Sequence, residues 1–456
     1  MVRSIFVTVC LFPLIVGCAN HCIEGDCGMA SGKTLLFGGE NLRLQDVSVD
    51  GTQIAVLDSS DDLIVIERNS GATTTVAQGV DKARFKGGGV LTIFNGYDGA
   101  TDIAAELLVW DGSGEPQPTG TDVDMSSVRG TDDGLHLYWK EDLGTTLGTV
   151  DLFLDGDVIV ASALAERVRF TSNDAHLIVA SNVDTGISVL NQVQTFNLAN
   201  GAVTTLVVDG AANRFQVTED GSTLVLAVNE VGDVADLVTM PITGGVAQTL
   251  ALQASDNEFT ILDDEATLAY LIPNNPLSPT AFSLASKPLA GGSAASLANV
   301  VDTIESTGTD TVVFCTATDA AGLCTLHLAQ ADGSDTQELG GQAQDEGYTS
   351  DGNYYLFYES VHTGLSGLIG TLQVVDVNSG SIDTLFDDVD NAQDLDTDRV
   401  VFQDDLGNVI LGTASDLSWN VVALQADDYI AVSESGSAAV LTIETGKLAG
   451  LHVIDL

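Results

Sequence analysis

Basic residues are the scarcest chemical class in this sequence. The 456 residues include 15 Lys and Arg against 65 Asp and Glu, which gives a formal charge of −50. The acidic residues are spread along the whole chain, so the charge belongs to a folded surface rather than to an acidic tail. Such a surface repels phosphate groups and anionic lipid headgroups. We therefore exclude nucleic acid and anionic membrane surfaces as partners.

Long helical patterns and long apolar runs are also missing. From Thr34 onward no stretch keeps a helical periodicity. The apolar run from Ile5 to Val16 is too short to cross a bilayer as a helix, which needs about 20 residues. Hydrophobic residues nevertheless make up 45% of the chain, which excludes intrinsic disorder.

The beginning of the chain has the features of a secretory signal. Arg3 precedes the apolar run, and Gly17-Cys18 ends it. The sequence from Ile15 to Cys18 resembles the bacterial lipobox. The resemblance implies cleavage before Cys18, a diacylglycerol on its thiol and an acylated amine. An ordinary signal peptide with an incidental cysteine is the alternative.

Lipidation at Cys18 predicts a stable anchor, because several acyl chains hold a protein where a single chain binds only marginally. The residue after the cysteine is Ala19 rather than the aspartate that resembles an inner-membrane retention signal, which favours the outer membrane. We therefore expect a signal peptide over 1–17, a lipidated tether over 18–33 and a cell-envelope protein.

The cysteines agree with export. Six are present; Cys10 leaves with the signal peptide and Cys18 is lipidated. The remaining four form two close pairs: Cys22 with Cys27, and Cys315 with Cys324. Four cysteines allow three connectivities, but the spacing favours the two local bridges, and an oxidising compartment favours disulfides. Four free thiols are the alternative; the spacing is unsuited to zinc.

Short apolar strands and polar turns repeat along the chain. A polar turn followed by an apolar strand is clearest at 48–59, 170–182, 217–229 and 349–360. A second strand then leads into a glycine turn and a strand rich in Thr, Val and Leu. Each unit reads as a four-stranded meander of about 42 residues.

A single unit cannot bury both of its faces, so the units must stack around an axis. We therefore predict an all-β fold, a β-propeller of four-stranded blades forming one domain over 34–456. About ten units are recognised, and they begin near Leu44, Asp81, Asp124, Glu166, Ala211, Ala254, Val301, Asp345, Ala392 and Asp427. One ring of ten blades, two smaller propellers, or eight blades with wrongly divided units remain open.

The two ends of the repeat array are complementary. The last unit supplies three strands, and an unassigned strand precedes the first unit at 34–39. Pairing of this strand with the last unit would complete one blade and remove two exposed edges. We predict that the N-terminal strand closes the ring.

The turn-and-strand units resemble PD40 and TolB-like propeller repeats, in which Ser-Pro-Asp-Gly precedes an apolar strand. The family proline is missing at every matching place: Val49 precedes Asp50, Glu219 precedes Asp220, and Ser350 precedes Asp351. The resemblance implies propeller architecture over most of 44–456, and it implies no particular function.

Catalytic motifs are absent from the sequence. The string at 364–368, GLSGL, lacks the final glycine of a nucleophile elbow, and no sialidase-type aspartate boxes occur. His136, His327 and His452 fall within strand patterns and are expected to be packed or surface residues. We therefore favour a non-catalytic binding or scaffolding module for an envelope protein or glycan. The alternative is a hydrolase or lyase with a site assembled across blades.

Alternating carboxylates form one candidate metal site. Asp394, Asp396 and Asp398 could offer several oxygens to calcium, which binds six to eight. Arg399 stands where an EF-hand loop needs glycine, and no glutamate closes the loop. Solvated turn aspartates are therefore favoured over a calcium site, and no other cofactor is predicted.

Overall fold

The computed structural model describes most of the chain after the tether. The described residues are 33–38, 42–142, 144, 149–184, 189–208, 211–275, 281–349, 351–363, 368–394, 398–404, 406, 408–423, 427–432, 438–443 and 450–455. These residues are nearly all in β-strands or turns. The helices among them are two short 3₁₀ turns, η1 (Gly87–Gly89) and η2 (Met125–Ser127), so no helix of the described part could span a membrane.

Four sheets contain four antiparallel strands each. Three of them are simple meanders: β2 (Arg43–Val47), β3 (Gln53–Leu57), β4 (Leu63–Glu67) and β5 (Thr73–Ala77); β17 (Ala211–Val217), β18 (Thr223–Val231), β19 (Val234–Pro241) and β20 (Gln248–Ser255); β21 (Phe259–Ile261), β22 (Thr267–Pro273), β23 (Phe282–Pro288) and β24 (Ala295–Val301). The fourth joins both ends of the chain: β35 (Asp427–Val432), β36 (Ala438–Ile443), β37 (Gly450–Asp455) and β1 (Lys33–Gly38).

Two further sheets are longer. The first, of 11 strands, contains β6 (Lys82–Phe85), β7 (Leu91–Asp98), β8 (Ile103–Trp110), β9 (Gln117–Asp124), β10 (Arg129–Gly130), β11 (Leu137–Asp142), β12 (Val150–Leu154), β13 (Asp157–Phe170), β14 (His176–Asp184), β15 (Val189–Asn197) and β16 (Val203–Val208). The second, of 10 strands, contains β25 (Thr303–Thr307), β26 (Thr311–Thr316), β27 (Cys324–Gln330), β28 (Thr336–Tyr348), β29 (Tyr354–Thr363), β30 (Leu368–Asp376), β31 (Ile382–Asp394), β32 (Arg399–Asp404), β33 (Val409–Thr413) and β34 (Ser418–Ala423).

Three long strands connect neighbouring meanders within these larger sheets. β13 has 14 residues, and β28 and β31 have 13 each. The N-terminal half of each strand pairs with the preceding meander and the C-terminal half with the next. Each long strand is therefore the outer strand of one meander and the inner strand of the following one.

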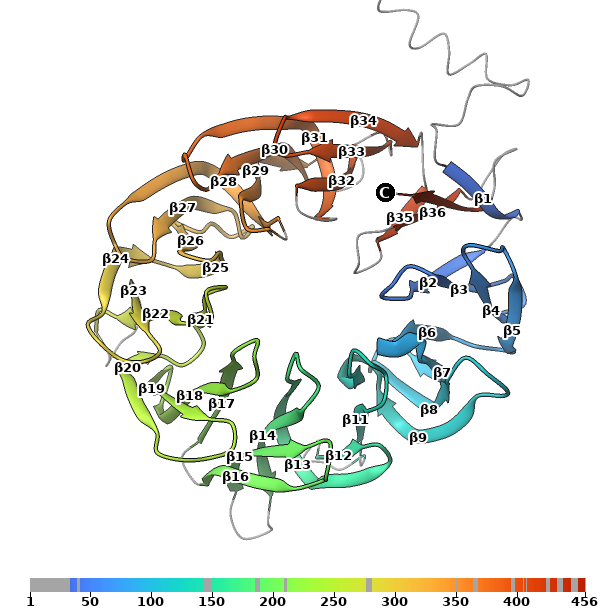
Figure 1. Ribbon diagram of the computed structural model, residues 1–456, viewed down its shortest axis with the longest axis horizontal. Helices are drawn as coiled ribbons and strands as arrows, with labels where there is room; N and C mark the ends of the chain where they lie inside the picture. Colours follow the sequence, from blue (N-terminus) through green and yellow to red (C-terminus); the bar gives the residue numbers. More distant parts are fainter. Residues whose placement is uncertain are drawn as a thin grey trace, which may run out of the picture.

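The sheets follow one another around a common centre (Figure 1). Radial repetition of four-stranded antiparallel meanders is the architecture of a β-propeller, so the predicted all-β fold class is confirmed. Two predicted unit starts are displaced, however. Asp124 is the last residue of β9, and Ala254 lies in β20, where it pairs with Ala235. Their units begin later because these outer strands extend further than their apolar pattern.

The expected pairing between the ends of the chain is confirmed. β1 pairs antiparallel with β37, from Lys33 opposite Ile454 to Gly38 opposite Gly450. The strand begins one residue before the predicted segment 34–39 and supplies the fourth strand of the last sheet.

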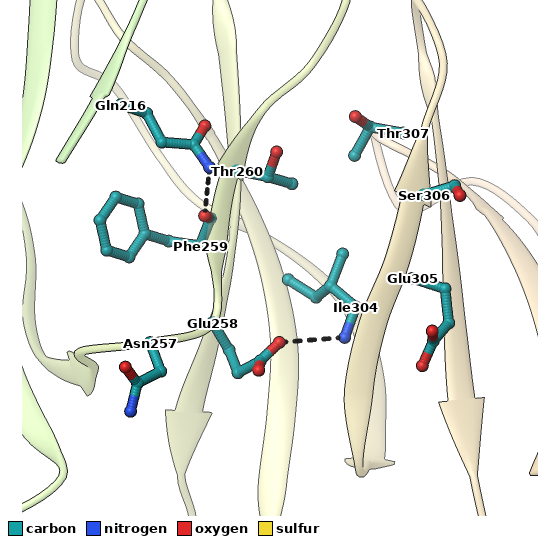
Figure 2. Close-up of a pocket in the computed structure, with 9 residues that line it drawn as sticks. All are labelled: Gln216, Asn257, Glu258, Phe259, Thr260, Ile304, Glu305, Ser306 and Thr307. Carbon is teal, nitrogen blue, oxygen red and sulfur yellow. Dashed lines mark hydrogen bonds between the residues drawn. The ribbon is translucent and has the colours of Figure 1, made fainter. Parts of the chain in front are cut away.

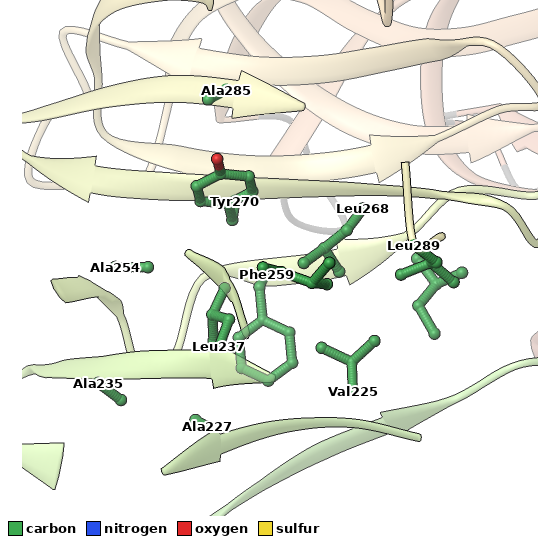
Figure 3. Close-up of a cluster of buried hydrophobic side chains, with 12 residues drawn as sticks. Val225, Ala227, Ala235, Leu237, Ala254, Phe259, Leu268, Tyr270, Ala285 and Leu289 are labelled. Carbon is green, nitrogen blue, oxygen red and sulfur yellow. The ribbon is translucent and has the colours of Figure 1, made fainter. Parts of the chain in front are cut away.

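Central strands are buried on both faces because each sheet packs between two neighbours. In β18, Leu224 and Leu226 pack toward the preceding sheet, whereas Val225 and Ala227 pack toward the following one. All four side chains are fully buried. The hydrophobic cluster that contains Val225 and Ala227 also includes Phe259 from β21 (Figure 3). This two-sided burial explains why central strands are continuously apolar rather than alternating.

The repeated polar turn has a common hydrogen-bond pattern. At Thr218, the side-chain hydroxyl donates to the Asp220 carboxylate at 2.7 Å and accepts the backbone N–H of Thr223 at 3.0 Å. The same pair of bonds begins at Ser48, Thr131, Thr171 and Thr349. Gly221 takes a positive φ of 66°, a conformation that glycine adopts without strain. The hydroxyl at the first position and the oxygen acceptor at the third thus define the repeat without the family proline.

Candidate binding site on the inner rim

The inner strands of the sheets lie nearest the centre of the ring (Figure 1). β17, β21 and β25 are neighbouring inner strands (Figure 1). A pocket of about 240 Å³ lies between β21 and β25. We call it the inner-rim pocket; it is lined by Gln216, Asn257, Glu258, Phe259, Thr260, Ile304, Glu305, Ser306 and Thr307.

Two lining side chains join adjacent inner strands. The Gln216 amide donates to the carbonyl of Phe259 at 2.8 Å and accepts the N–H of Ile261 at 2.8 Å. The Glu258 carboxylate accepts the N–H of Ile304 at 3.3 Å (Figure 2). These side chains satisfy backbone groups at the edge of the next sheet, which would otherwise lack partners. The walls of the pocket are therefore fixed relative to each other.

The pKa of Glu258 depends mainly on the burial of its carboxyl group. Burial raises the pKa of Glu258 because the charged form is poorly solvated, and the N–H of Ile304 opposes that rise. The nearby negative charge of Glu305 raises the pKa further, while the positive charge of Arg214 lowers it. The pocket thus combines two glutamates with one arginine close by.

Glu305 is the exposed carboxylate of this pocket. It lies at a bulge in β25, where the register shifts between Ile304 and Ser306. A bulge redirects one side chain away from the regular alternation. Asn257 is also exposed, and Thr260 and Thr307 are half-buried. Together these groups can accept and donate hydrogen bonds to a hydroxyl, amide or amine of a ligand.

The next inner strand, the C-terminal half of β28, carries a second pair of carboxylates, Asp345 and Glu346. Asp345 accepts the Ser306 hydroxyl at 2.8 and 2.9 Å, and it also accepts the Tyr355 hydroxyl. Burial raises the pKa of Asp345, and the bonds from Tyr355 and Ser306 oppose this rise. Ser306 thereby connects the inner-rim pocket to Asp345.

Glu346 has the most strongly shifted carboxyl group with a defined value. Burial raises the pKa of Glu346 to about 7, with a further contribution from the charge of Asp345 and an opposing hydrogen bond from Tyr358. The residue lies at a bulge of β28, where the register shifts between Asp345 and Gly347. A carboxyl group with such a pKa is partly protonated near neutral pH.

The structure places two members of the predicted aspartate cluster, Asp394 and Asp398. Asp398 accepts the N–H of Ala414 at 2.7 Å through its carbonyl, and its carboxylate accepts the Ser415 hydroxyl. Asp394 is the last residue of β31, and Asp396 lies outside the described residues. Among the described residues, no group of three or more His, Cys, Asp or Glu side chains is arranged to hold a metal. A calcium site at Asp394, Asp396 and Asp398 therefore stays a prediction.

The second predicted disulfide is present. Cys315 lies near the end of β26, and Cys324 is the first residue of β27. The two cysteines form a disulfide with a Cα–Cα distance of 5.6 Å. Cys18, Cys22 and Cys27 lie outside the described residues.

Two of the histidines have the packed or surface environments expected for them. The His136 ring is 2.6 Å from the Asp155 carboxylate, and the His327 ring stacks on Phe314 with ring centres 5.1 Å apart. The sequence analysis missed Gln216, Glu258 and Glu346. Gln216 and Glu258 share no position in their repeats, because Gln216 lies within β17 and Glu258 precedes β21, so no common sequence signal marks them.

Comparisons with known proteins give no family assignment. No family model matches the sequence, and no curated protein matches it. Solved structures resemble the chain at low identity. A TolB homologue from Agrobacterium tumefaciens is 15% identical, with 51% of this chain and 84% of that chain covered and a TM-score of 0.32.

Two further structures have similar scores. The oligogalacturonate lyase of Vibrio parahaemolyticus is 9% identical, covers 93% of each chain and has a TM-score of 0.37. The β-propeller domain of the Trilobed protease from Pyrococcus furiosus is 8% identical, with 66% of this chain and 98% of that chain covered and a TM-score of 0.37. Similarity at this level carries no information on function.

Proposed function

We propose that the protein is an exported, lipid-anchored β-propeller that binds a protein or glycan of the cell envelope through its inner rim, without catalysing a reaction. The inner-rim pocket carries the proposal. Gln216 and Glu258 hold its walls by bonds to neighbouring strands, while Glu305 and Asn257 are exposed. Exposed polar groups on a fixed frame suit recognition, because little conformational freedom is lost on binding.

The ligand should offer hydrogen-bond donors and carry no strong negative charge. Glu305 can only accept hydrogen bonds when ionised, and the formal charge of −50 repels anions. Neutral glycans, aminoglycans and protein segments with hydroxyl or amine groups fit this requirement.

An oligosaccharide array with neutral, amine-bearing and uronate-bearing members tests this function. We expect binding to neutral or amine-bearing members, weakened about tenfold by Glu305→Gln and unchanged by Glu115→Gln, an exposed residue in the turn between β8 and β9. In a parallel experiment, this protein is immobilised and its capture of purified envelope proteins is measured. Equal binding by both variants would contradict a role for the inner-rim pocket.

The propeller would form a single closed ring of ten blades. If the long strands β13, β28 and β31 each contribute to two blades, the strands form ten sets of four, with β1 completing the last set. This division supports the sequence-based count, because each set corresponds to one predicted unit.

Attachment would occur through Cys18, at the outer membrane. Cys18→Ser should release the protein from the membrane fraction, and mass spectrometry of the wild type should find acyl chains on the N-terminal peptide. A Cys18→Ser variant that still sediments with membranes, together with an unmodified wild type, would refute the anchor.

The alternative function is a hydrolase or lyase acting at the inner rim. One observation favours it: a buried carboxyl group with a pKa of about 7, such as Glu346, resembles the general acid that such chemistry needs. Incubation with neutral and uronate oligosaccharides should then yield shortened products, and Glu346→Gln should abolish them. Unchanged oligosaccharides would leave the binding function as the better account.

We further propose that Asp394, Asp396 and Asp398 are solvated turn aspartates rather than calcium ligands. Calorimetric titration with calcium chloride should give no heat that Asp398→Asn removes. A saturable signal lost in that variant would establish the metal site instead.

A further inference from the structure

A second pocket lies on the outer side of the ring, apart from the inner-rim pocket. It has a volume of about 400 Å³ and lies between the outer part of β31 and the outermost strand β34. We call it the outer pocket; its walls include Thr384, Phe386, Asp387, Asp388, Asp404 and Trp419.

One wall of the outer pocket is an aromatic surface held by the core. The Trp419 side chain is 48% exposed and meets Phe386 edge-on, with ring centres 5.0 Å apart. Phe386 in turn packs against the fully buried Phe402 at 5.1 Å. The other two tryptophans, Trp110 and Trp139, are buried. Trp419 is therefore a rigid aromatic platform that is open to solvent.

Another part of the lining is acidic. Asp387 and Asp388 directly follow Phe386 in β31 and are both exposed. Asp387 accepts the Thr371 hydroxyl at 3.1 Å, which orients its carboxylate. Asp404 lies beside this segment, because it pairs with Val389 in the adjoining strand.

The described residues that line the outer pocket carry no positive charge. Among the described residues that line it, none is Lys, Arg or His. An aromatic face attracts a cation through the ring quadrupole, and Trp does so most strongly. Carboxylates beside that face add charge-assisted hydrogen bonds from an ammonium or guanidinium group. The walls are thus complementary to a positive side chain rather than to a neutral or acidic one.

We propose that the outer pocket binds a Lys or Arg side chain of a partner protein, with the cationic group over Trp419 and between Asp387 and Asp388. This site is independent of the inner-rim pocket. The chain itself has only 15 basic residues, so a basic partner is a better occupant than a second copy. A basic partner would also be drawn toward the acidic surface from a distance.

The probe for this site is a short Lys–Gly peptide, with its Nε-acetylated form and maltohexaose as comparisons. We expect the Lys–Gly peptide to change tryptophan fluorescence in a saturable way, because Trp419 is the exposed indole among the three tryptophans. Binding should weaken with added salt, since the charges are exposed. The acetylated peptide and maltohexaose should have no effect.

Variants test which residues of the outer pocket bind the peptide. By calorimetry, Asp387→Asn with Asp388→Asn should weaken peptide binding about tenfold or more, and Trp419→Phe should weaken it about fivefold. Glu115→Gln removes one exposed charge from the turn between β8 and β9 and should leave affinity unchanged. Three results would overturn the proposal: no saturable binding of the peptide, equal losses with Glu115→Gln, or binding of maltohexaose that survives both aspartate substitutions.

Discussion

Replacing Glu346 with Gln should stabilise the protein at pH 8 and leave its stability nearly unchanged at pH 4. Glu346 has a pKa of about 7 in the folded protein because it is buried, compared with an ordinary value of 4.5. Gln has nearly the same shape as Glu but never ionises. The substitution therefore removes the buried charge without opening a cavity.

The sign and size follow from the two pKa values. At pH 4 the carboxyl group is largely protonated in both states, so its ionisation costs nothing. As pH rises from about 4.5 to about 7, the unfolded chain ionises first, and the folded protein loses stability relative to it. One pKa unit corresponds to about 1.4 kcal/mol, so the loss at pH 8 is on the order of 3 kcal/mol. Glu346→Gln should recover that amount at pH 8.

Urea unfolding followed by tryptophan fluorescence at pH 4, 6 and 8 measures this effect. The control is Glu338→Gln, which removes an exposed carboxylate from the same strand, β28. The free-energy difference between Glu346→Gln and the wild type should grow with pH, while that of the control should stay small. A difference that is constant with pH, or a variant that is less stable at pH 8, would refute the burial argument.

Three further predictions test the architecture. Deleting 34–40 should lower the free energy of unfolding by several kcal/mol, out of the ~5–15 typical of a domain, and promote aggregation, whereas deleting 23–29 should cost little beyond its predicted disulfide; calorimetry that finds equal effects would contradict closure by β1. Thr218→Val should cost about 1–2 kcal/mol and speed amide exchange at the turn, because two hydrogen bonds are lost; unchanged exchange would remove the turn from the stabilising features. Reducing the bond between Cys315 and Cys324 should cost about 2–3 kcal/mol, and non-reducing peptide mapping that links either cysteine elsewhere would disprove the pairing.

The sequence was sufficient for the features that are local. The strand class, the repeated turn and the Cys315–Cys324 bond depend on residues close together in the chain. The pairing of β1 with β37 was also predictable, because one unit lacked a strand and one strand lacked a unit. Element ends were less accurate: Ala254 belongs to an outer strand because strand pairing continues beyond the apolar pattern.

The contacts that build the inner-rim pocket depend on residues one repeat apart. Gln216 reaches Phe259, 43 positions away, and Glu258 reaches Ile304, 46 positions away. A single sequence gives no reason to pair these positions until the ring is assembled. The pKa of Glu346 was equally hidden, because its largest cause is burial in the folded protein, and the charge of the neighbouring Asp345 adds only a smaller contribution.

The pairing of β1 with β37 determines the order in which the sheets of this protein can fold. Lys33 is synthesised long before its partner Ile454. Until β37 is present, β1 and the early meanders have unpaired strand edges. Such edges can pair with other chains. Contacts of such long sequence separation also form slowly. The final sheet can assemble only after β37 has been synthesised, so the growing chain would benefit from a chaperone that shields β1 until then.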